Sequence, residues 1–252
     1  MTLILGKNMH RVEPEPLWFR RPPTYEAGKL VVVLSGAGIS AESGLSTFRD
    51  SGGLWEKYSI YEVATPEAWQ RNPKLVLDFY NARRAQLAQV QPNPAHHAIK
   101  TLEDHYTVIV ITQNVDDLHE RAGSSYILHL HGELTKARST KNESLIYHIG
   151  HEPIELGDVC EEGSQLRPHV VWFGEAVPFY PIAEAWARQA DIFLVVGTSL
   201  QVYPAAGLLE EAYHAKQKFL IDPKPTFTSR DINVIAAPAS EGLSKVLEAL
   251  IP

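Results

Sequence analysis

Small and polar residues follow three apolar runs of this sequence, at the points where buried strands would end. They are Gln113, Asn114 and Asp116 after the first run, His131 after the second, and Gly197, Thr198 and Ser199 after the third. In open α/β sheets a ligand binds beyond the carboxyl ends of the strands, so these residues could surround one ligand. Helix capping would explain one of Asn114 and Asp116, but three polar groups within four residues exceed what a cap needs.

His131 is the candidate for proton transfer at this edge. Histidine is the side chain whose ordinary pKa, about 6.5, lies closest to neutral pH. His129 and His131 share one face of a strand by alternation, but only His131 lies at the strand tip. A single histidine among eleven is more often structural or solvated, so the position of His131 carries this interpretation.

A glycine-rich turn follows the apolar run 30–34. Gly36, Ala37 and Gly38 open a Gly-x-Gly-x-x-Ala pattern that leads into a helix start. Such a turn lets the backbone approach a pyrophosphate, which the free N–H groups of the helix would meet. The pattern also occurs as a plain strand–helix corner, and no acidic ribose-binding residue is evident about 20 positions further on. The turn alone therefore leaves both readings open.

The segment after this turn carries Phe48 and Arg49. Two serines and Gly44 interrupt any helix that would continue from the turn. An arginine near a phosphate could neutralise its charge, and a phenylalanine could cover a reactive ring. Spacing alone favours the plainer alternative, a surface loop with one anchoring aromatic residue.

Continuous apolar runs alternate with helical patterns along most of the chain. The runs, rich in Val, Ile and Leu, are residues 29–34, 107–112, 126–130, 169–173, 191–196, 218–221 and 232–236. Apolar residues have helical spacing in residues 73–90, 95–104, 181–189, 205–215 and 240–250. Continuous runs are typical of strands buried on both faces. The sequence therefore predicts an α/β fold, with a Rossmann-like parallel sheet and helices on both faces.

The length of 252 residues suits one large α/β domain with small inserts. Residues 1–28 are rich in proline and predict an irregular N-terminal arm. Residues 29–252 would form the main domain. Two stretches interrupt its alternation, an aromatic helical one at about 50–72 and a polar one at about 134–168 that predicts a small inserted lobe.

Composition excludes several classes of protein. The net charge of −7 gives no strong basic field, so we expect no nucleic-acid partner. No apolar run approaches the roughly 20 residues of a membrane helix, and the N-terminal apolar stretch is too short for a secretory signal. Cys160 is the only cysteine, which excludes an internal disulfide and a four-thiolate zinc site. We expect a cytoplasmic protein with no membrane partner.

Six motifs in order resemble the sirtuin family of NAD-dependent protein-lysine deacylases. They are Gly36-Ala37-Gly38-Ile39-Ser40, Gly44-x-x-x-Phe48-Arg49, Thr112-Gln113-Asn114-Val115-Asp116, His131-Gly132-Glu133, Val171-Trp172-Phe173-Gly174-Glu175 and Gly197-Thr198-Ser199. Together they span most of residues 30–222, and six ordered matches are far more specific than any one of them. The resemblance implies that residues 29–252 form a sirtuin catalytic domain.

The resemblance implies a role for each matched position. For NAD, Gly36, Ala37 and Gly38 would hold the pyrophosphate, Gln113 and Asn114 the nicotinamide ribose, and Asp116 the carboxamide, while Gly197, Thr198 and Ser199 would line the adenosine side. Phe48 would shield the ribose carbon, Arg49 would fix the cofactor loop, and His131 would be the general base. The acyl-lysine peptide would pair with Val171, Phe173, Gly174 and Glu175. Asp222 stands where the family often has Asn at the adenosine ribose, and its carboxylate can accept the same hydrogen bond.

The implied reaction moves the acyl group from lysine to NAD-derived ribose. Its products are free lysine, nicotinamide and 2′-O-acyl-ADP-ribose, and the pocket must exclude water to avoid plain NAD hydrolysis. Two alternatives stay open: a sirtuin-fold NAD hydrolase or ADP-ribosyltransferase, and a non-catalytic module that binds NAD or ADP-ribose. A peptide-binding strand at 171–175 argues against the first alternative, and His131 argues against the second.

Three residues resemble the class III sirtuins, which remove acidic acyl groups. Tyr80 and Arg83 lie three positions apart on a predicted helix, so they share a face. The plainer alternative is an exposed aromatic–cation pair. The resemblance implies instead that they bind a carboxylate at the end of the acyl chain, which the guanidinium suits. Ala64 would leave room for that chain. We therefore expect succinyl- and malonyl-lysine as substrates, together with acetyl-lysine.

The zinc-binding cysteines typical of the family are missing. Family members usually carry two Cys-x-x-Cys pairs in the small lobe, the first of which would fall near Ser139 and Asn142. Cys160 lies near the second pair, and His148 and His151 could join it only in an unusual site. We expect no zinc, with the lobe held by packing instead. The apolar residues available for that packing are Leu145, Ile146, Tyr147, Ile154 and Leu156.

Overall fold

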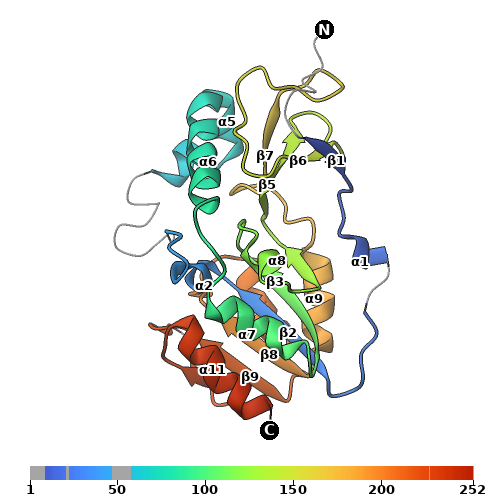
Figure 1. Cartoon of the computed structure of the whole chain (residues 1–252), viewed down its shortest axis with the longest axis vertical. Helices are drawn as coiled ribbons and strands as arrows, with labels where there is room; N and C mark the ends of the chain where they lie inside the picture. The colour runs from blue at the N-terminus through green and yellow to red at the C-terminus, as the bar shows by residue number, and fades with distance from the viewer. Residues whose placement is uncertain (1–8, 21–22, 47–57, 227, 252) are drawn as a thin grey trace.

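The chain folds around two sheets, which lie at opposite ends of the molecule (Figure 1). The computed structural model describes residues 9–20, 23–46, 58–226 and 228–251. Within these residues, one sheet has six parallel strands and the other has four strands with antiparallel pairing. We call the parallel sheet with its helices the large lobe.

The parallel sheet confirms the predicted fold class. Its strands are β2 (Leu30–Ser35), β3 (Thr107–Thr112), β4 (Ile127–His129), β8 (Ile192–Val196), β9 (Gln217–Ile221) and β10 (Asn233–Ile235). They lie in the order β10-β9-β8-β2-β3-β4, and each pair of neighbours is parallel. Read from β4, this is the Rossmann order, in which a crevice forms where the chain order reverses, between β2 and β8.

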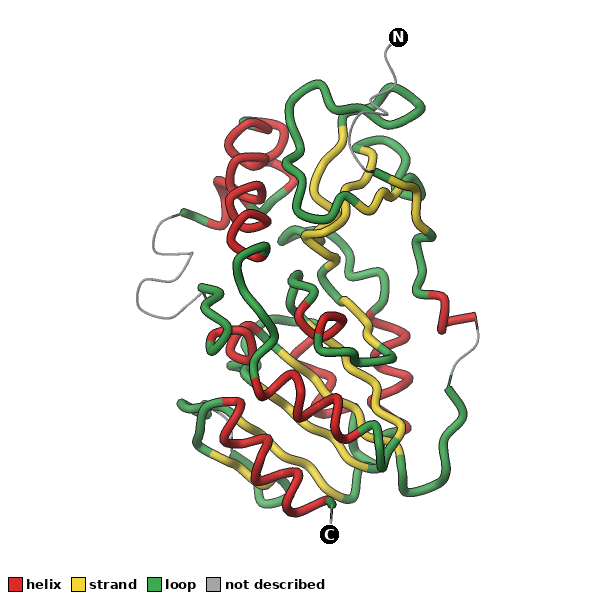
Figure 2. The backbone as a smooth tube through the Cα atoms, viewed as in Figure 1, coloured by secondary structure: helices red, strands yellow, loops and turns green. Residues whose placement is uncertain are grey.

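Helices cover both faces of the parallel sheet (Figure 2). They are α7 (Pro94–Leu102) and α11 (Ala239–Leu250) on one face, and α9 (Tyr180–Gln189), η1 (Ala205–Gly207) and α10 (Leu208–Glu211) on the other. Val31 and Val33 of β2 pack on the first face, and Leu30 and Val32 pack on the second. All four are fully buried, which explains why the run is continuous rather than alternating.

The antiparallel sheet belongs to a second unit, which we call the small lobe. Its strands lie in the order β1 (His10–Val12), β6 (Ile146–His148), β5 (Gly132–Ser139) and β7 (Leu166–Val170). The helices α4 (Ile60–Val63), α5 (Pro66–Arg71) and α6 (Pro73–Leu87) complete this lobe. The predicted insertions thus contribute most of these elements, although residues 50–57 lie outside the described residues.

Polar–proline pairs begin three of the helices around the lobes. Thr65, Asn72 and Asn93 each accept a backbone N–H with the side chain, and a proline follows each of them at the first helical position. The side-chain oxygen satisfies a donor that the helix leaves unpaired, and proline needs no such partner. These local signals fix where α5, α6 and α7 start.

The run 169–173 was predicted as a strand of the parallel sheet, and that prediction is wrong. Its first part belongs to β7, which pairs antiparallel with β5 and ends at Val170. β5 begins at Gly132, which has φ +78° and approaches β7 so closely that a Cβ there would lie 2.1 Å from the His169 carbonyl oxygen. An apolar run reports burial but not strand direction, so the sequence pattern could not place this segment.

The N-terminal arm contains more regular structure than predicted. In its described part, β1 pairs with β6 of the small lobe, and α1 (Leu17–Arg20) lies against the large lobe. The Trp18 indole N–H donates to the Ile127 carbonyl at 3.3 Å, and its ring packs near Tyr126 and Trp186. The arm therefore contacts both lobes, because each offers it an open strand edge.

The core of the small lobe differs from the prediction at two residues. Leu145, Tyr147 and Ile154 are buried as expected, but Leu156 is 51% exposed and does not join the core. Cys160, which was not among the residues named for this packing, is a core residue with 4% of its surface exposed. Polar surroundings in the sequence hid the burial of this cysteine.

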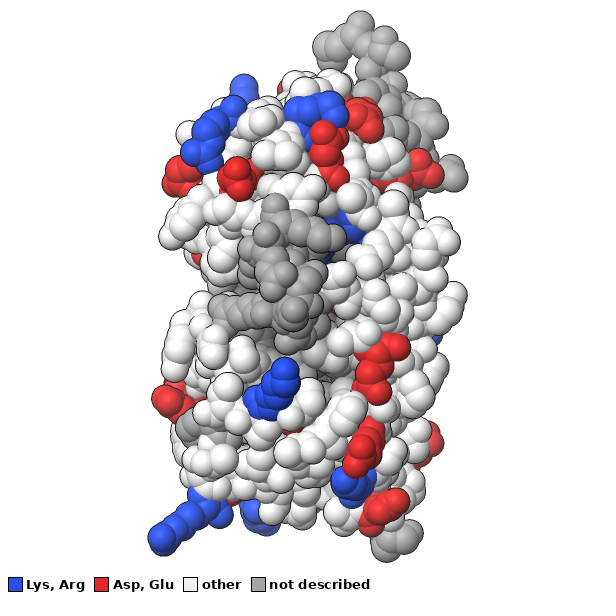
Figure 3. Space-filling model, turned by 90° about the vertical axis from the view of Figure 1, so that its left-hand side faces the viewer, with Lys and Arg blue, Asp and Glu red and all other residues white. Residues whose placement is uncertain are grey.

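The surface carries mixed charge, with acidic and basic side chains interspersed over the face in Figure 3. In the part of the chain that the structure describes, no helix is long and apolar enough to cross a membrane. The cytoplasmic location stays a prediction.

Candidate active site

A pocket of about 370 Å³ lies between the two lobes, at the carboxyl ends of the parallel strands. All but one of the described candidate residues line it. They are Gly36, Ala37, Gly38, Ala64, Tyr80, Arg83, Gln113, Asn114, His131, Val171, Phe173, Gly174, Glu175, Gly197, Thr198, Ser199 and Asp222. The exception is Asp116, and Phe48 and Arg49 lie outside the described residues.

The loops after β2 and β8 interlock at the crevice of the sheet. The Gly38 N–H donates to the Gly197 carbonyl at 2.8 Å, and a Cβ on Gly36 would lie 2.6 Å from the Cβ of Thr198. Gly197 has φ +62°, and a Cβ there would lie 2.3 Å from the Ile39 nitrogen. The glycines are thus required for the close approach of two strand-end loops, which then line one end of the pocket.

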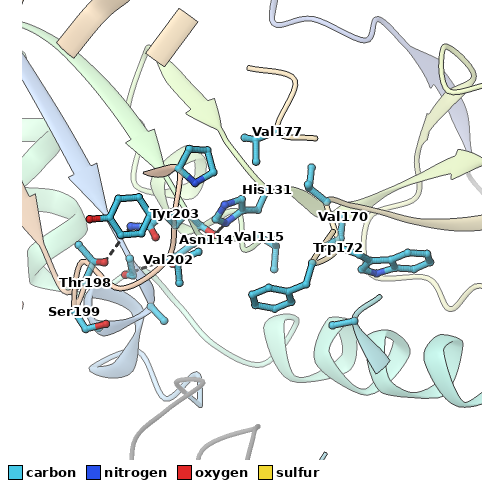
Figure 4. A pocket seen from close by; sticks show the side chains of 18 of the residues that line it. Asn114, Val115, His131, Val170, Trp172, Val177, Thr198, Ser199, Val202 and Tyr203 are labelled. Atoms are coloured by element: carbon cyan, nitrogen blue, oxygen red, sulfur yellow. Dashed lines mark hydrogen bonds between the residues drawn. The ribbon is translucent and has the colours of Figure 1, made fainter. Parts of the chain in front are cut away.

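His131 lies near the middle of the pocket, with Thr198 and Ser199 toward one end and Trp172 toward the other (Figure 4). Its Nδ1 lies 3.0 Å from the Gln113 carbonyl oxygen, which can only accept a proton. Nδ1 therefore carries the hydrogen, and Nε2 is the nitrogen left to act as a base. Burial lowers the pKa of His131, against the opposing hydrogen bond to Gln113, so the ring is neutral at physiological pH.

Asn114 and Asp116 belong to one buried network behind the pocket wall. The Asn114 amide donates to the Gly36 carbonyl at 3.2 Å and to the Ser40 hydroxyl at 3.1 Å. Ser40 in turn donates to Asp116 at 3.0 Å, and Asp116 also accepts the N–H of Leu118. Burial raises the pKa of Asp116, although these hydrogen bonds oppose the shift. Asp116 therefore lies next to the lining residues rather than among them.

Two hydrogen bonds position the residues nearest the crevice. The Gln113 amide donates to the Thr198 hydroxyl at 3.1 Å, which joins the ends of β3 and β8. Asp222 follows β9 and accepts the backbone N–H of Lys224 at 2.8 Å. Residues after β3, β4 and β8 thus line one pocket, as the sequence predicted, and Asp222 after β9 lines it too.

Tyr80 and Arg83 line the opposite end of the pocket together with Ala64. Both project from α6, and the Tyr80 side chain is 4% exposed. Burial raises the pKa of Tyr80 to about 12, although the nearby Arg83 guanidinium opposes this. Burial lowers the pKa of Arg83, while Tyr80 and Asp116 oppose this effect. The result is a cation and a phenol donor side by side in a low-dielectric recess, a suitable site for an anion.

Glu175 is held by two arginines that the sequence did not single out. Arg167 donates to its two carboxylate oxygens at 2.6 and 3.0 Å, and Arg138 lies 3.2 Å away. The same carboxylate accepts the backbone N–H of Trp172 at 2.8 Å, and the Arg167 guanidinium lies over the indole ring of Trp172. This network fixes the loop 171–175. Arg167 lies in the Leu-Arg-Pro run that begins β7, but the sequence does not show its ion pair because Glu175 reaches it only in the fold.

The pocket also contains residues that the sequence did not nominate. They are Val115, Val170, Trp172, Val177, Val202, Tyr203, Pro204 and Lys224. Most lie within one or two positions of a candidate, so the motif neighbours were the available signal. Tyr203 is 73% exposed and stands at the edge of the pocket.

Comparisons with known proteins agree with this geometry. Residues 36–204 match the Sir2 family. The chain belongs to the Sir2 family. This confirms the sirtuin resemblance of the sequence. A protein of Bacteroides thetaiotaomicron named NAD-dependent protein deacylase is 55% identical over 231 residues, which cover 89% of this chain and 99% of that protein. A Helicobacter pylori protein (strain 26695) with the same name is 58% identical over 196 residues, covering 78% and 85%.

Solved structures of Sir2 homologues share the fold. One, in complex with ADP-ribose, has a TM-score of 0.82 at 38% identity and covers 87% of this chain and 91% of its own. Another, in complex with NAD, has a TM-score of 0.78 at 37% identity and covers 88% and 89%. A third Sir2 structure holds a deacetylated p53 peptide and 3′-O-acetyl-ADP-ribose, with a TM-score of 0.74 at 28% identity and coverage of 88% and 93%.

The residues at the expected zinc positions of this Sir2 protein do not suit zinc. Among the described residues, no cluster of three or more His, Cys, Asp or Glu side chains could hold a metal ion. The Ser139 hydroxyl accepts the backbone N–H groups of Lys141 and Asn142. Ser139 also hydrogen-bonds the Cys160 side chain, and together with bonds from Ser164 this lowers the pKa of the thiol against the effect of burial. The segment near Ser139 and the segment near Cys160, where the two cysteine pairs were expected, thus lie in contact, but together they carry one thiol.

Proposed function

We propose that this chain is an NAD-dependent protein-lysine deacylase that transfers the acyl group from lysine to the ribose of NAD, with one water consumed overall and free lysine, nicotinamide and 2′-O-acyl-ADP-ribose released. The observation that carries the proposal is the neutral His131, placed in the pocket between the crevice of the Rossmann sheet and the recess of Tyr80 and Arg83. A base at that junction can act on a ribose hydroxyl once NAD and an acyl-lysine enter from opposite ends.

We assign the cofactor roles along the large-lobe side of the pocket. Gly36, Ala37 and Gly38 would hold the pyrophosphate, Gln113 and Asn114 the nicotinamide ribose, Asp116 the carboxamide, and Gly197, Thr198, Ser199 and Asp222 the adenosine side. Phe48 and Arg49 keep their expected roles as proposals, outside the described residues. NAD supplies a ribose carbon that becomes electrophilic as nicotinamide leaves.

The chain's own groups then orient the substrates and move one proton. The Gln113 carbonyl holds the imidazole of His131 in the tautomer whose Nε2 can remove a proton from a ribose hydroxyl. Val171 and Phe173 border the path of the acyl-lysine, and their apolar side chains help to exclude water. Exclusion of water favours acyl transfer over hydrolysis of NAD.

The substrate peptide would lie along the loop 171–175. The Val171 and Phe173 N–H groups already donate to the carbonyl oxygens of His131 and Ala64. A peptide would therefore add along the opposite edge of this loop. The Glu175 carboxylate is bound to Arg167 and Arg138, so Gly174 and Glu175 would serve the peptide through their backbone. Addition of an extended peptide to such an edge is a common recognition mode.

Tyr80 and Arg83 direct the preference toward acyl groups that end in a carboxylate. Tyr80 is buried there, Arg83 is half-buried and cationic, and the small side chain of Ala64 lines the pocket beside them. A succinyl or malonyl group would place its carboxylate against Arg83 and the Tyr80 hydroxyl. An acetyl group lacks that contact but meets the same base, so acetyl-lysine remains a substrate.

Arg83→Met tests this preference. We expect the variant to lower kcat/KM for a succinyl-lysine peptide by about 100-fold, because one charge-assisted contact contributes roughly 1.5–3 kcal/mol and the acyl carboxylate would be left unpaired. The value for an acetyl-lysine peptide should change less than about threefold. Arg71→Met, on an exposed part of α5, is the matched control and should leave both values unchanged. Equal losses on both peptides in Arg83→Met would contradict the proposal.

The two alternative functions give different products. Nicotinamide release without any peptide would indicate NAD hydrolysis, and binding of NAD without turnover would indicate a binding module. We expect nicotinamide release to depend on the acyl peptide.

A further inference from the structure

His129 is a buried charged group beside the site that the mechanism above does not use. It ends β4, where it pairs in register with Thr112, and is 8% exposed. Its Nδ1 lies 3.1 Å from the Asn114 carbonyl oxygen, and its Nε2 lies 2.6 Å from the Glu120 carboxylate. Both partners accept protons, so both ring nitrogens carry one and the ring is an imidazolium.

The surroundings of His129 stabilise this charge. The charged groups that face it are Glu120 on α8 (Leu118–Arg121), Glu133 on β5 and Asp116 on the loop before α8. His119, also on α8, is neutral because burial lowers its pKa well below the usual value. Burial alone would lower the pKa of His129, but Glu120, Glu133 and the two hydrogen bonds raise it to about 10.

The two histidines of this segment hold consecutive carbonyl groups of the same loop. His131 binds the carbonyl of Gln113, and His129 binds the carbonyl of Asn114. The loop is therefore held by one neutral imidazole, that of His131, and one cationic imidazolium, that of His129. A charge-assisted hydrogen bond is roughly twice as strong as a neutral one, so the His129 bond is the stronger restraint.

The restrained residue connects directly to the cofactor side of the pocket. Besides its carbonyl, Asn114 uses its amide to bind Gly36 and Ser40, and Ser40 binds Asp116. A shift of the Asn114 backbone would move this whole network, including the glycine turn. A displacement of about 1 Å in such a shell is enough to cost activity.

We propose that His129, kept protonated by Glu120, is a positioning residue that fixes Asn114 and Asp116 for the nicotinamide end of NAD. The inference rests on the proposed function, because it takes those two residues as NAD ligands. His129 touches neither substrate, since it acts through the Asn114 carbonyl. Glu120 is 39% exposed, so the restraint extends from a surface carboxylate to the pocket wall.

Two substitutions of His129 separate its two bonds. Asparagine places its amide nitrogen where Nδ1 stands and keeps a donor for Asn114, whereas glutamine reaches toward Glu120 and loses that donor. We expect His129→Gln to lower kcat/KM for NAD at least 10-fold, with KM for the acyl peptide changed less than twofold. His129→Asn should recover part of the lost activity, because it keeps the donor to Asn114 but not the charge. Equal activity of the two variants, or an equal effect on both substrates, would overturn the inference.

Glu120→Gln tests the charge and leaves the buried ring in place. Removing the carboxylate lowers the pKa of His129, since burial is then opposed mainly by Glu133. At pH 6 the variant should resemble the wild type, and between pH 7 and 9 its kcat/KM for NAD should fall several-fold while the wild type shows no such fall. Glu241→Gln, which removes an exposed carboxylate of α11, is the matched control and should follow the wild-type profile. A Glu120→Gln profile identical to that of the wild type would overturn the inference, even where a His129 variant fails to fold. If the wild type turns over and the His129 and Glu120 variants are as active as it is, this inference alone is overturned. If the wild type shows no NAD-dependent turnover, the proposed function is overturned and this inference with it.

Discussion

His129 and His131 are only two positions apart, but one is protonated and the other is neutral. His129 lies between carboxylates and is charged, whereas His131 is buried beside a carbonyl and is neutral. The sequence predicts that both lie on one face of a strand and that His131 is at its tip. It does not predict the charges, because these depend on Glu120 and Glu133, which the fold brings to one of the two rings.

The lowered pKa of His131 predicts the acid side of the pH profile. A base must be unprotonated, and a pKa below 6.5 keeps the ring neutral to lower pH, so activity is lost only as the pH falls through that value. We expect the acid midpoint of kcat/KM below pH 6.5 with a succinyl- or acetyl-lysine peptide. His97→Gln, which changes an exposed histidine on α7, should leave the midpoint in place. An acid midpoint above 6.5 in the wild type would contradict a neutral, buried base.

At the scale of elements, α6 serves two sites with adjacent faces. Tyr80 and Arg83 face the pocket, and Asn81 and Arg84, one position further, face the small lobe. Asn81 makes two hydrogen bonds to the backbone of Ile154, both at 2.9 Å, and accepts a third from Arg84. Arg84 is fully buried and also donates to the Glu152 carbonyl. These bonds join the helix to the backbone of residues 152–154 in the small lobe.

Asn81→Ala should therefore destabilise the protein. The variant loses two bonds to Ile154 and removes a partner of the buried Arg84, so we expect a loss of about 2–4 kcal/mol in the free energy of unfolding. Asp78→Asn, on the same helix, breaks only an exposed ion pair with Lys74 and should cost less than about 0.5 kcal/mol. Urea unfolding measures both. A chelator should change neither curve, and a chelator-sensitive wild type or an unaffected Asn81→Ala would contradict this account of the lobe.

The sequence predicted the elements of the large lobe more fully than those of the small one. All six of its described strands have predicted positions within one residue at either end, because continuous apolar runs and polar strand ends are local signals. The prediction for segment 169–173 failed because its partner strand, β5, lies more than 30 residues away in the sequence and pairs with it antiparallel in the small lobe. The Arg167–Glu175 bond and the burial of Cys160 also depend on distant partners.

On the scale of the whole molecule, the pocket exists because two lobes face each other. The large lobe contributes the strand ends that line the crevice, and the small lobe contributes Tyr80, Arg83 and the loop 171–175. The arm of residues 9–20 contacts both lobes, through β1 and Trp18. A reaction between two substrates that enter from opposite ends fits this division, because His131 lies between Thr198 at one end and Trp172 at the other (Figure 4).

The most direct test of this account is a mass balance on one reaction. The wild-type protein is incubated with NAD and a succinyl-lysine peptide, and deacylated peptide, nicotinamide and succinyl-ADP-ribose are quantified by mass spectrometry. We predict equal amounts of the three products, and neither deacylated peptide nor succinyl-ADP-ribose with His131→Ala, which lacks the base for the ribose hydroxyl. If the wild-type protein instead forms nicotinamide and ADP-ribose while the peptide keeps its succinyl group, the central claim is contradicted.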